Sequence, residues 1–424
     1  MKPSRAEINA LLGRRAKFLE RRPVISIARS LGALSRRWLR KNDVFRKKAL
    51  RRLVKESAFS EAMAVALIDA LFGELTTAKL LRLLRSEFSD PRALDTFRPD
   101  AVTGHRHRAH GPRLVTHIFS GNVPNPSLVS FVCGMLLKSA NVGKPSARDK
   151  GFIDIYLESL RAHDRKLAST NLLVSGKQAA IEWSRNSDRV VAYGDDASLG
   201  AIRRQIPDRV PFSGYGRRVS FALYAAEALK KNKRLLARMT ARDVWMMDQR
   251  GCLSPVTVYV ESGTKDGALD FAGLLAHELR KKASRSARRV TLERASDTQI
   301  QRWRHQARKI AGKDAHFWES PGSWAVVYEE GTDFSLSPGG QIVHVRGFKS
   351  LDSVWSALWP FRRHLQCVAL EAGTARRRSL AERLSRLGAS RVCRAGRMQV
   401  PPSTWHHDGL PNLAGWVRWT DLEG

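Results

Sequence analysis

The stretch DVWMMDQRGCLSPVTVYV, residues 243–260, carries the signals that decide the fold. It follows a basic amphipathic segment typical of a helix, and Gly251 and Pro255 then mark a turn. Val256–Val260 is a short apolar run rich in β-branched residues, which predicts a strand. A helix, a turn and a buried strand in this order form one unit of an α/β architecture.

Similar apolar runs, separated by stretches long enough for helices, recur from Leu114 onwards. They are LVTHIF (114–119), VVAYG (190–194), WAVVYEE (324–330), QIVHVRGF (341–348) and CVALEA (367–372). Strands that alternate with helices predict parallel sheets, so we expect two α/β domains, at residues 101–240 and 241–390. A tail at 391–424 is expected to pack back on the body.

Residues 1–100 instead show helical patterns and predict a helical N-terminal layer. Ser60 is expected to cap a run that carries Leu67 and Leu71, and Thr77 a run that carries Leu80 and Leu84. An apolar stripe normally marks burial, so this layer is expected to pack on the rest of the chain.

Composition bounds the class of protein. The chain has 424 residues and 43% hydrophobic content, enough for two or three packed domains. Its four cysteines, Cys133, Cys252, Cys367 and Cys393, form no CxxC pair, and no secretory signal is evident, so we expect a reduced, cytoplasmic protein. No stretch reaches the roughly 18 apolar residues that a spanning helix needs, so no membrane span is expected.

The formal charge of +34 indicates a polyanionic partner, whether nucleic acid, anionic lipid or a phosphorylated cofactor. Lysine and arginine are scattered from Arg5 to Arg418 without interleaved aromatic residues or a recognition helix for nucleic-acid bases, which argues against a nucleic-acid partner. A basic binding or scaffold protein nevertheless remains an alternative class.

Cys252 is the candidate nucleophile. It follows Gly251 in a turn that enters a strand, where a thiol is reachable and its own backbone N–H can donate to an oxyanion. Taken alone, a single cysteine is more often a small core residue.

Asn122 is the candidate oxyanion donor. It lies between Gly121 and Pro124, directly after the run Leu114–Phe119, where its carboxamide can donate a hydrogen bond. The alternative is an asparagine that serves only the geometry of the turn.

Lys144, Ser146 and Gly194 lie where predicted strands end and helices begin. Such positions suit ribose and phosphate contacts of a dinucleotide at the carboxyl edge of a sheet. The chain contains no GxGxxG, so the usual fingerprint gives no support.

In their order, Asn122, Lys144, Gly194 and Cys252 resemble the aldehyde dehydrogenase superfamily. More closely, the chain resembles the fatty acyl-CoA reductase family, which includes the reductase of bacterial bioluminescence. The motifs that carry the resemblance are HIFSGNVP (117–124), VGKPSARD (142–149), VVAYG (190–194), SGYGRRVSFAL (213–223), DQRGCLSP (248–255) and WHHDG (405–409).

The resemblance implies an aldehyde-dehydrogenase-like α/β fold and reduction of a long-chain fatty acyl-CoA or other acyl thioester to the aldehyde. Residues 101–240 would bind the nucleotide and residues 241–390 would carry the nucleophile Cys252, with Asn122 as oxyanion donor. Lys144, Ser146, Arg148 and Gly194 would bind the cofactor.

Two departures from the superfamily bear on the direction and the cofactor of the reaction. Residues 210–226 contain no acid, whereas oxidative relatives carry a glutamate there that activates the water attacking the acyl-enzyme. Ala147 and Arg148 follow the Lys-Pro-Ser turn where members that prefer NAD often have an acid, which favours the 2′-phosphate of NADPH.

A third departure concerns the ribose of the nicotinamide. The glutamate with which the superfamily binds this ribose is replaced by Phe334, so we expect that contact to be made differently.

The remaining polar signals predict no metal. His117, His406 and His407 lack a third ligand at suitable spacing, so WHHDG is expected to be structural or to close the site. The expected partners are an acyl-CoA or acyl-carrier substrate and an acyl-activating protein. The sequence leaves open whether the protein forms a homo-oligomer. The alternatives are an aldehyde dehydrogenase that works in the oxidative or CoA-acylating direction, and a basic scaffold with a vestigial site.

Overall fold

The computed structural model describes residues 3–56, 59–100, 102–121, 124–146, 151–262, 265–283, 301–303, 305, 315–320 and 323–423. The chain forms two compact units. Unit 1 comprises Met1–Leu53, Ile68–Arg217 and Pro402–Gly424, and unit 2 comprises Val54–Leu67 and Arg218–Pro401. The units divide at Arg217 and Arg218, whereas the expected boundary lay near residue 240, because the strand that follows Arg218 already pairs within the second sheet.

Helices make up most of the described part of residues 5–94, which confirms the predicted helical N-terminal layer. The helices are α1 (Arg5–Arg15), α2 (Val24–Leu39), α3 (Val44–Glu56), α4 (Glu61–Gly73) and α5 (Thr77–Glu87). Ser60 caps α4 by accepting a hydrogen bond from the Met63 N–H at 3.2 Å. The cap predicted at Thr77 is wrong by one residue, since Thr76 occupies the N-cap of α5 and its side chain makes no capping hydrogen bond.

Within unit 1, helix α2 attaches this layer to the helices of the first sheet. The Trp38 ring stacks on Phe72 with centroids 4.4 Å apart, and its indole N–H donates to Ser159 Oγ at 3.0 Å. Gly32 permits a close approach of α2 to α5, because a Cβ there would lie 2.3 Å from the Thr77 nitrogen. A larger residue at position 32 would push the two helices apart.

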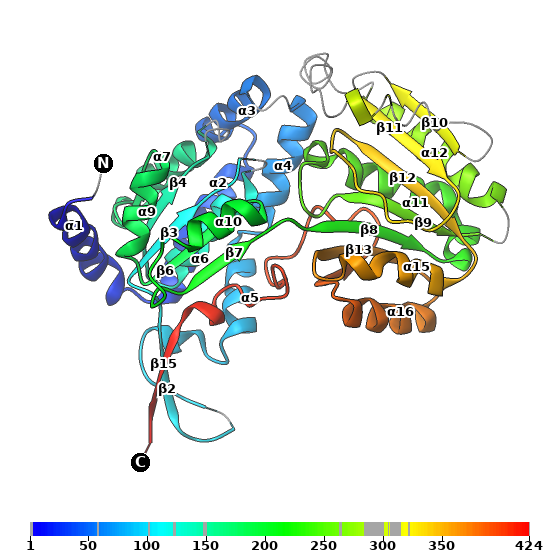
Figure 1. Ribbon diagram of the computed structural model, residues 1–424. Coiled ribbons are helices and arrows are strands. Elements are labelled where there is room, and N and C mark those ends of the chain that lie inside the picture. Colours follow the sequence, from blue (N-terminus) through cyan, green and yellow to red (C-terminus); the bar gives the residue numbers. More distant parts are fainter. Residues whose placement is uncertain are drawn as a thin grey trace. The chain divides into compact units, whose positions relative to one another are not determined.

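Unit 1 is built around a five-stranded parallel sheet in the order β5-β4-β3-β6-β7 (Figure 1). Its strands are β3 (Leu114–Ile118), β4 (Ala140–Lys144), β5 (Asn171–Leu173), β6 (Arg189–Tyr193) and β7 (Phe212–Tyr215). The helices between them are α6 (Asn125–Leu136), α7 (Phe152–His163), α8 (Arg165–Ala168), α9 (Lys177–Arg185) and α10 (Asp196–Arg203). Every residue of β3 is buried, as expected for the central strand of a sheet covered on both faces.

A smaller antiparallel sheet projects from unit 1 (Figure 1). It contains β1 (Arg98–Pro99), β2 (Arg106–His110) and β15 (Arg418–Leu422), with β2 in the middle. His110 faces Arg418 in the register, so this ribbon joins residues from opposite ends of the chain.

Unit 2 is built around a seven-stranded sheet in the order β10-β11-β12-β9-β8-β13-β14. Its strands are β8 (Val219–Tyr224), β9 (Pro255–Glu261), β10 (Ala315–Ser320), β11 (Trp324–Glu329), β12 (Ile342–Phe348), β13 (Leu365–Glu371) and β14 (Arg391–Cys393). Only the pair β10–β11 is antiparallel among the described strands of this sheet. The predicted α/β fold with two parallel-type units and a helical N-terminal layer is thus confirmed.

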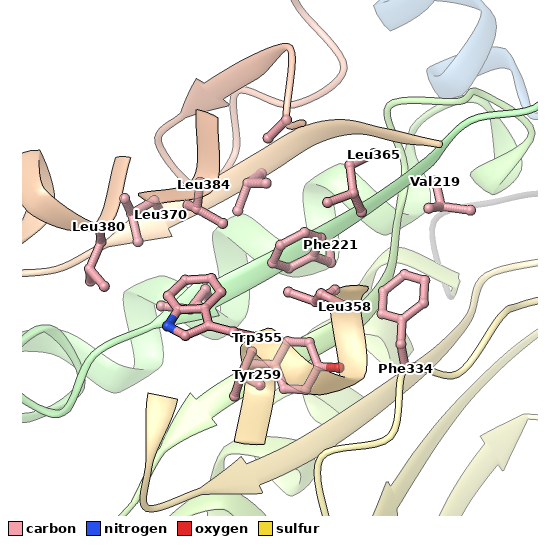
Figure 2. Close-up of a cluster of buried hydrophobic side chains, with 14 of the residues drawn as sticks. Val219, Phe221, Tyr259, Phe334, Trp355, Leu358, Leu365, Leu370, Leu380 and Leu384 are labelled. Carbon is pink, nitrogen blue, oxygen red and sulfur yellow. The ribbon is translucent and has the colours of Figure 1, made fainter. Parts of the chain in front are cut away.

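Helices cover both faces of this second sheet. They are α11 (Ala226–Trp245), α12 (Lys265–Ala283), α15 (Leu351–Leu358) and α16 (Thr374–Leu387). Tyr224 packs edge-on against Phe271 of α12, whereas Phe221 belongs to the core under α15 and α16 (Figure 2). Within the described residues, none of the helices is long and apolar enough to cross a membrane.

His117 is buried in the centre of the first sheet. Its Nε2 lies 3.0 Å from Asn141 Oδ1 and its Nδ1 lies 2.7 Å from Ser130 Oγ. Asn141 Oδ1 can only accept, so Nε2 carries the proton and Nδ1 accepts from Ser130 in the neutral ring. Burial lowers the pKa of His117 to about 4. The structure therefore holds this histidine neutral as part of the core.

We predict that His117 makes unfolding sensitive to acid. The unfolded chain binds a proton near pH 6.5 and the folded chain only near 4, so stability is full above 6.5 and is lost as pH falls towards 4. The loss should be on the order of 3 kcal/mol. Urea unfolding at several pH values measures it, and His117→Gln should flatten this part of the profile. An equally steep profile in the variant would assign the acid sensitivity to other groups.

Candidate active site

Cys252 lies in unit 2, on the turn between a short 3-10 helix (η3, Met246–Gln249) and strand β9. Its side chain is exposed, whereas Leu253 and Ser254 after it are buried. The predicted placement of a thiol at a turn entering a strand is therefore confirmed. A thiol placed in this way is accessible to a substrate while its backbone is anchored.

The backbone before Cys252 takes a rare conformation. Met247, Asp248 and Gln249 have φ values of 53°, 57° and 56°, in the left-handed region that residues other than glycine usually avoid. Each such residue costs roughly 1–2 kcal/mol, and the cost is tolerated only where surrounding contacts determine the conformation. Side-chain hydrogen bonds from this segment and from a neighbouring strand hold it in place.

The Gln249 carboxamide supplies the first of these contacts. Strand β9 begins with Pro255, which has no N–H, and its backbone pairing with β12 begins only at Thr257 and His344. Gln249 occupies the gap: its Nε2 donates to the carbonyls of Pro255 (2.9 Å) and Ile342 (2.7 Å), and its Oε1 accepts from the Ile342 N–H (2.7 Å). The side chain thus replaces a peptide group between the two strands.

The neighbouring residue Asp248 is also held. Its buried carboxylate accepts a hydrogen bond from Gln341 Nε2 at 3.1 Å and lies 3.5 Å from Arg250 Nε. The Arg250 guanidinium in turn lies over the Phe59 ring at 5.5 Å. These contacts help to fix the turn before Cys252.

Ser220 supplies a second contact, on the other side of β9. Its Oγ donates to the Cys252 carbonyl at 2.7 Å and accepts from the Cys367 N–H at 3.1 Å. The strand pairings are irregular here, with register shifts beside Ser220 in β8 and between Leu365 and Val368 in β13. The hydroxyl satisfies backbone groups that the ladders leave unpaired, and it fixes the peptide of Cys252.

Buried polar groups lie beneath the turn. Gln399 donates through Nε2 to Ser254 Oγ and to the Asp243 carbonyl, and a Cβ at Gly251 would come within 3.1 Å of Gln399 Oε1. The Asp243 carboxyl accepts hydrogen bonds from the N–H groups of Gly396 (2.6 Å) and Met398 (3.1 Å), and burial raises its pKa to about 7. Residues 395–399 are thereby tied to the end of α11.

In unit 1, the carboxyl edge of the five-stranded sheet brings Lys144 and Gly194 together. Lys144 ends β4 opposite Ile118 of β3, and Gly194 directly follows β6, the neighbour of β3 on its other side. Ser146 follows two residues after Lys144. The chain runs from β3 outwards through β4 to β5 and then crosses back to β6 on the other side of β3, which makes this edge the topological switch point where α/β folds bind ligands.

Two predicted site residues, Asn122 and Arg148, lie outside the described residues. Their roles remain predictions. Cys252 belongs to unit 2, and Lys144, Ser146 and Gly194 belong to unit 1.

The motif WHHDG packs onto unit 1. His407 stacks on Tyr215 at a centroid distance of 4.4 Å and an interplanar angle of 14°, and Tyr215 stacks on Tyr193 at 4.9 Å. Glu87 accepts hydrogen bonds from backbone N–H groups of the tail, including that of Leu413 at 2.9 Å. Among the residues that the structure describes, no group of three or more His, Cys, Asp or Glu is placed to hold a metal.

Phe334 belongs to the hydrophobic core of unit 2 (Figure 2). Its ring centroid lies 6.1 Å from that of Phe221 and 4.7 Å from that of Phe361. The aromatic side chain that the resemblance aligns with a ribose-binding glutamate is therefore a packing residue.

Sequence reasoning missed Ser220, Gln249 and Gln399. Two of them gave a signal: Ser220 interrupts the apolar run Val219–Tyr224, and Gln249 precedes a strand that starts with proline. Gln399 gave none, because its partner Ser254 is distant in sequence.

Comparison with known proteins gives a consistent result. The sequence model of a family described as acyl-CoA reductase (LuxC) matches residues 23–419. A long-chain acyl-protein thioester reductase of Aliivibrio fischeri is 21% identical over 341 residues, covering 74% of this chain and 65% of that protein. Its counterpart in Photorhabdus laumondii is 22% identical over 416 residues, covering 94% and 82%. The chain thus spans just under two thirds of the first of these relatives.

Solved structures support the aldehyde dehydrogenase fold. An NAD-dependent benzaldehyde dehydrogenase from Corynebacterium glutamicum has a TM-score of 0.68 at 14% identity, with 100% of this chain and 90% of that chain covered. Aldehyde dehydrogenase 21 from Physcomitrella patens has a TM-score of 0.72 at 10% identity, with 99% and 91% covered. The predicted fold family is confirmed.

We predict that Gln249→Leu destabilises unit 2, because it leaves the Ile342 N–H and two buried carbonyls without their partner. Each unsatisfied buried group costs about 1–3 kcal/mol, so the free energy of unfolding should fall by roughly 2–4 kcal/mol. Urea unfolding measures the change. Gln178→Leu, at an exposed position where the amide donates to Glu182 on its own helix, is the matched control and should change little. Equal small effects in both variants would remove Gln249 from its role in the turn.

Proposed function

Since this chain belongs to the acyl-CoA reductase (LuxC) family, we propose that it reduces a long-chain acyl thioester to the fatty aldehyde through an acyl-enzyme on Cys252. The observation that carries the proposal is the turn itself. An exposed thiol stands on a strained backbone that Gln249, Asp248 and Ser220 hold in place. A strained backbone conformation that is held by surrounding contacts is typical of a functional site.

The first step is thiol exchange. The Cys252 thiolate attacks the carbonyl carbon of the acyl thioester, and the tetrahedral intermediate expels the thiolate of coenzyme A or of a carrier. One C–S bond forms and one breaks, so the exchange is nearly balanced. A thiol with a pKa of about 8.5 leaves without help from a strong acid.

Two donors are proposed for the oxyanion of this step. One is the Cys252 N–H, in a backbone segment fixed by the Ser220 bond to the Cys252 carbonyl. The other is the Asn122 carboxamide, on the residue pattern of its turn. Losing one such donor typically costs about 100-fold or more in rate.

The cofactor is proposed to be NADPH. When bound, it supplies the hydride that converts the Cys252 thioester to a thiohemiacetal, from which aldehyde leaves as the C–S bond breaks. Lys144, Ser146 and Gly194 are the residues to hold it in unit 1, since a cation, a hydroxyl and a small residue lie at the sheet edge where dinucleotides bind. Arg148 is proposed to contact the 2′-phosphate.

The reductive direction rests on a missing base. Residues 210–226, which include β7 and β8, contain no Asp or Glu to activate water against the acyl-enzyme. Slow hydrolysis leaves the thioester available for hydride transfer. This absence makes free-acid formation, the oxidative alternative, the weaker candidate.

The acyl donor is proposed to be acyl-CoA or an acidic acyl-carrier protein, delivered by an acyl-activating partner. The net charge of +34 favours encounter with an acidic carrier, because complementary charge raises association rates.

We predict that the wild-type protein accumulates a covalent thioester with long-chain acyl-CoA or acyl-carrier protein when the nucleotide is withheld. Intact-mass spectrometry detects it, and Cys252→Ala should abolish it. Cys133→Ala, at a buried cysteine of unit 1, is the control and should retain it. Labelling that persists in Cys252→Ala, or that maps to Cys133, Cys367 or Cys393, would overturn the assignment, and a protein that never acylates would favour the scaffold alternative.

We predict a preference for NADPH over NADH that depends on Arg148. Arg148→Glu removes a charge-assisted contact to the 2′-phosphate. The ratio of kcat/KM for NADPH to kcat/KM for NADH should therefore fall roughly ten- to a hundred-fold. Arg161→Glu, an exposed position on α7, makes the same charge change and should leave the ratio alone. Equal use of both nucleotides by the wild type would contradict the cofactor assignment.

A further inference from the structure

Two cysteines that have no part in the proposed mechanism lie side by side in unit 2. Cys367 is on β13 and Cys393 is on β14, in adjacent parallel strands where Cys367 faces Arg391 and Ala369 faces Cys393. Their Sγ atoms are 3.7 Å apart, and both thiols are free. No sequence motif links the two cysteines, because 25 residues and the helix α16 separate their positions.

The two thiols differ in access. Cys367 is fully buried on a strand that pairs on both sides, with β8 and with β14. Cys393 is only partly buried, and β14 is the edge strand of the described sheet, three residues long. A small reagent from solvent therefore meets Cys393 first.

The two thiols also differ in acidity. The hydrogen bond from Cys367 lowers the pKa of Cys393 against the opposing effect of its partial burial, and the charge of Arg391 lowers it further. Burial raises the pKa of Cys367 well above its usual value. Arg391 Nη1 itself lies 3.4 Å from Cys367 Sγ. An accessible thiol that favours its thiolate beside a buried thiol is the arrangement of an attacking and a resolving cysteine.

We propose that Cys393 and Cys367 form a redox-active dithiol, which a hydroperoxide oxidises to an intramolecular disulfide with Cys393 attacking first. In the first step the Cys393 thiolate attacks a peroxide oxygen, the O–O bond breaks, and the released oxygen takes a proton and leaves as water or alcohol. Cys393 is then a sulfenic acid.

In the second step Cys367 attacks the sulfenic sulfur. The S–O bond breaks, the S–S bond forms, and the hydroxyl leaves as water with the proton of Cys367. The two thiols together lose two electrons, which the peroxide accepts. A low-molecular-weight thiol returns the pair to the reduced form by exchange.

Closing the bond requires the Sγ atoms to approach from 3.7 Å to about 2.05 Å. We expect β14 to move, because this edge strand pairs only with β13 in the described sheet, whereas β13 pairs with both β8 and β14. Cys367 is moreover tied through its N–H to Ser220, the residue that holds the Cys252 carbonyl. The site is therefore a neighbour of the nucleophile turn, but its chemistry does not depend on the proposed reductase activity.

The experiment uses full-length Cys252→Ser protein, which removes the exposed thiol and leaves Cys133, Cys367 and Cys393. After one equivalent of hydrogen peroxide, the free-thiol count should fall from three to one. The intact mass should fall by two hydrogen atoms, and peptide mapping should join the Cys367 and Cys393 peptides. Cys133, whose pKa burial raises to about 12, is the internal control and should keep its thiol.

Two further variants separate the roles. With Cys367→Ser added, Cys393 should stop at the sulfenic acid, seen as one added oxygen and trapped by dimedone. With Cys393→Ser added, Cys367 should resist the peroxide as Cys133 does. Alkylation by N-ethylmaleimide in the Cys252→Ser protein tests the difference in reactivity between the two thiols even if a further variant does not fold. Cys393 should react at least ten-fold faster than Cys367.

Three results would overturn the proposal. They are a Cys393 that oxidises no faster than Cys133, a sulfenic acid at Cys393 that persists while Cys367 is present, and a disulfide between different chains. Since Cys252 is absent throughout, failure here leaves the proposed reductase function untouched, and failure of acylation at Cys252 leaves the dithiol untouched.

Discussion

The start of strand β9 is the constraint on which the catalytic unit depends. Pro255 cannot donate to the ladder, so the two central strands β9 and β12 would part at the point where the chain must turn towards Cys252. The Gln249 carboxamide closes that gap, and Ser220 does the same on the side of β8. Side chains thus replace backbone pairing on both flanks of one strand. The turn that carries Cys252 can therefore depart from regular strand geometry, while side-chain hydrogen bonds fix the backbone on either side of it.

Much of the fold was predictable because local patterns encode it. Apolar runs such as Leu114–Phe119 and Val256–Val260 are buried on both faces, and this burial requires a continuous apolar sequence. The ribbon of β2 and β15 was not predicted, since its charged, half-exposed strands show no such run and pair across most of the chain. The division at Arg217 was missed for a related reason: α11 reads as a boundary helix in sequence, but β8 before it already belongs to the second sheet.

The residues of the candidate site were likewise predictable only in part from the sequence. Cys252 was predictable from its glycine turn and Lys144 and Gly194 from strand ends, because these depend on neighbours in sequence. The residues that hold the turn depend on register: Gln249 reaches Ile342, and Asp243 reaches Gly396 and Met398. Contacts of this kind follow only once strands are aligned. Motifs therefore locate the reacting atom, and the tertiary structure supplies the rigidity around it.

Unit 2 is a continuous insertion between residues 217 and 402 of unit 1, apart from the short segment Val54–Leu67. Strand β2 emerges from the ribosome long before its partner, since His110 must wait for Arg418, 308 residues later (418 − 110). At about 5–20 residues per second that interval is roughly 15–60 s, during which one edge of β2 has no partner. Unpaired edges recruit other chains unless they are protected. Strand β2 carries two arginines, Arg106 and Arg108, beside this edge. Arginine charges on an unpaired strand disfavour pairing with a second copy of this chain.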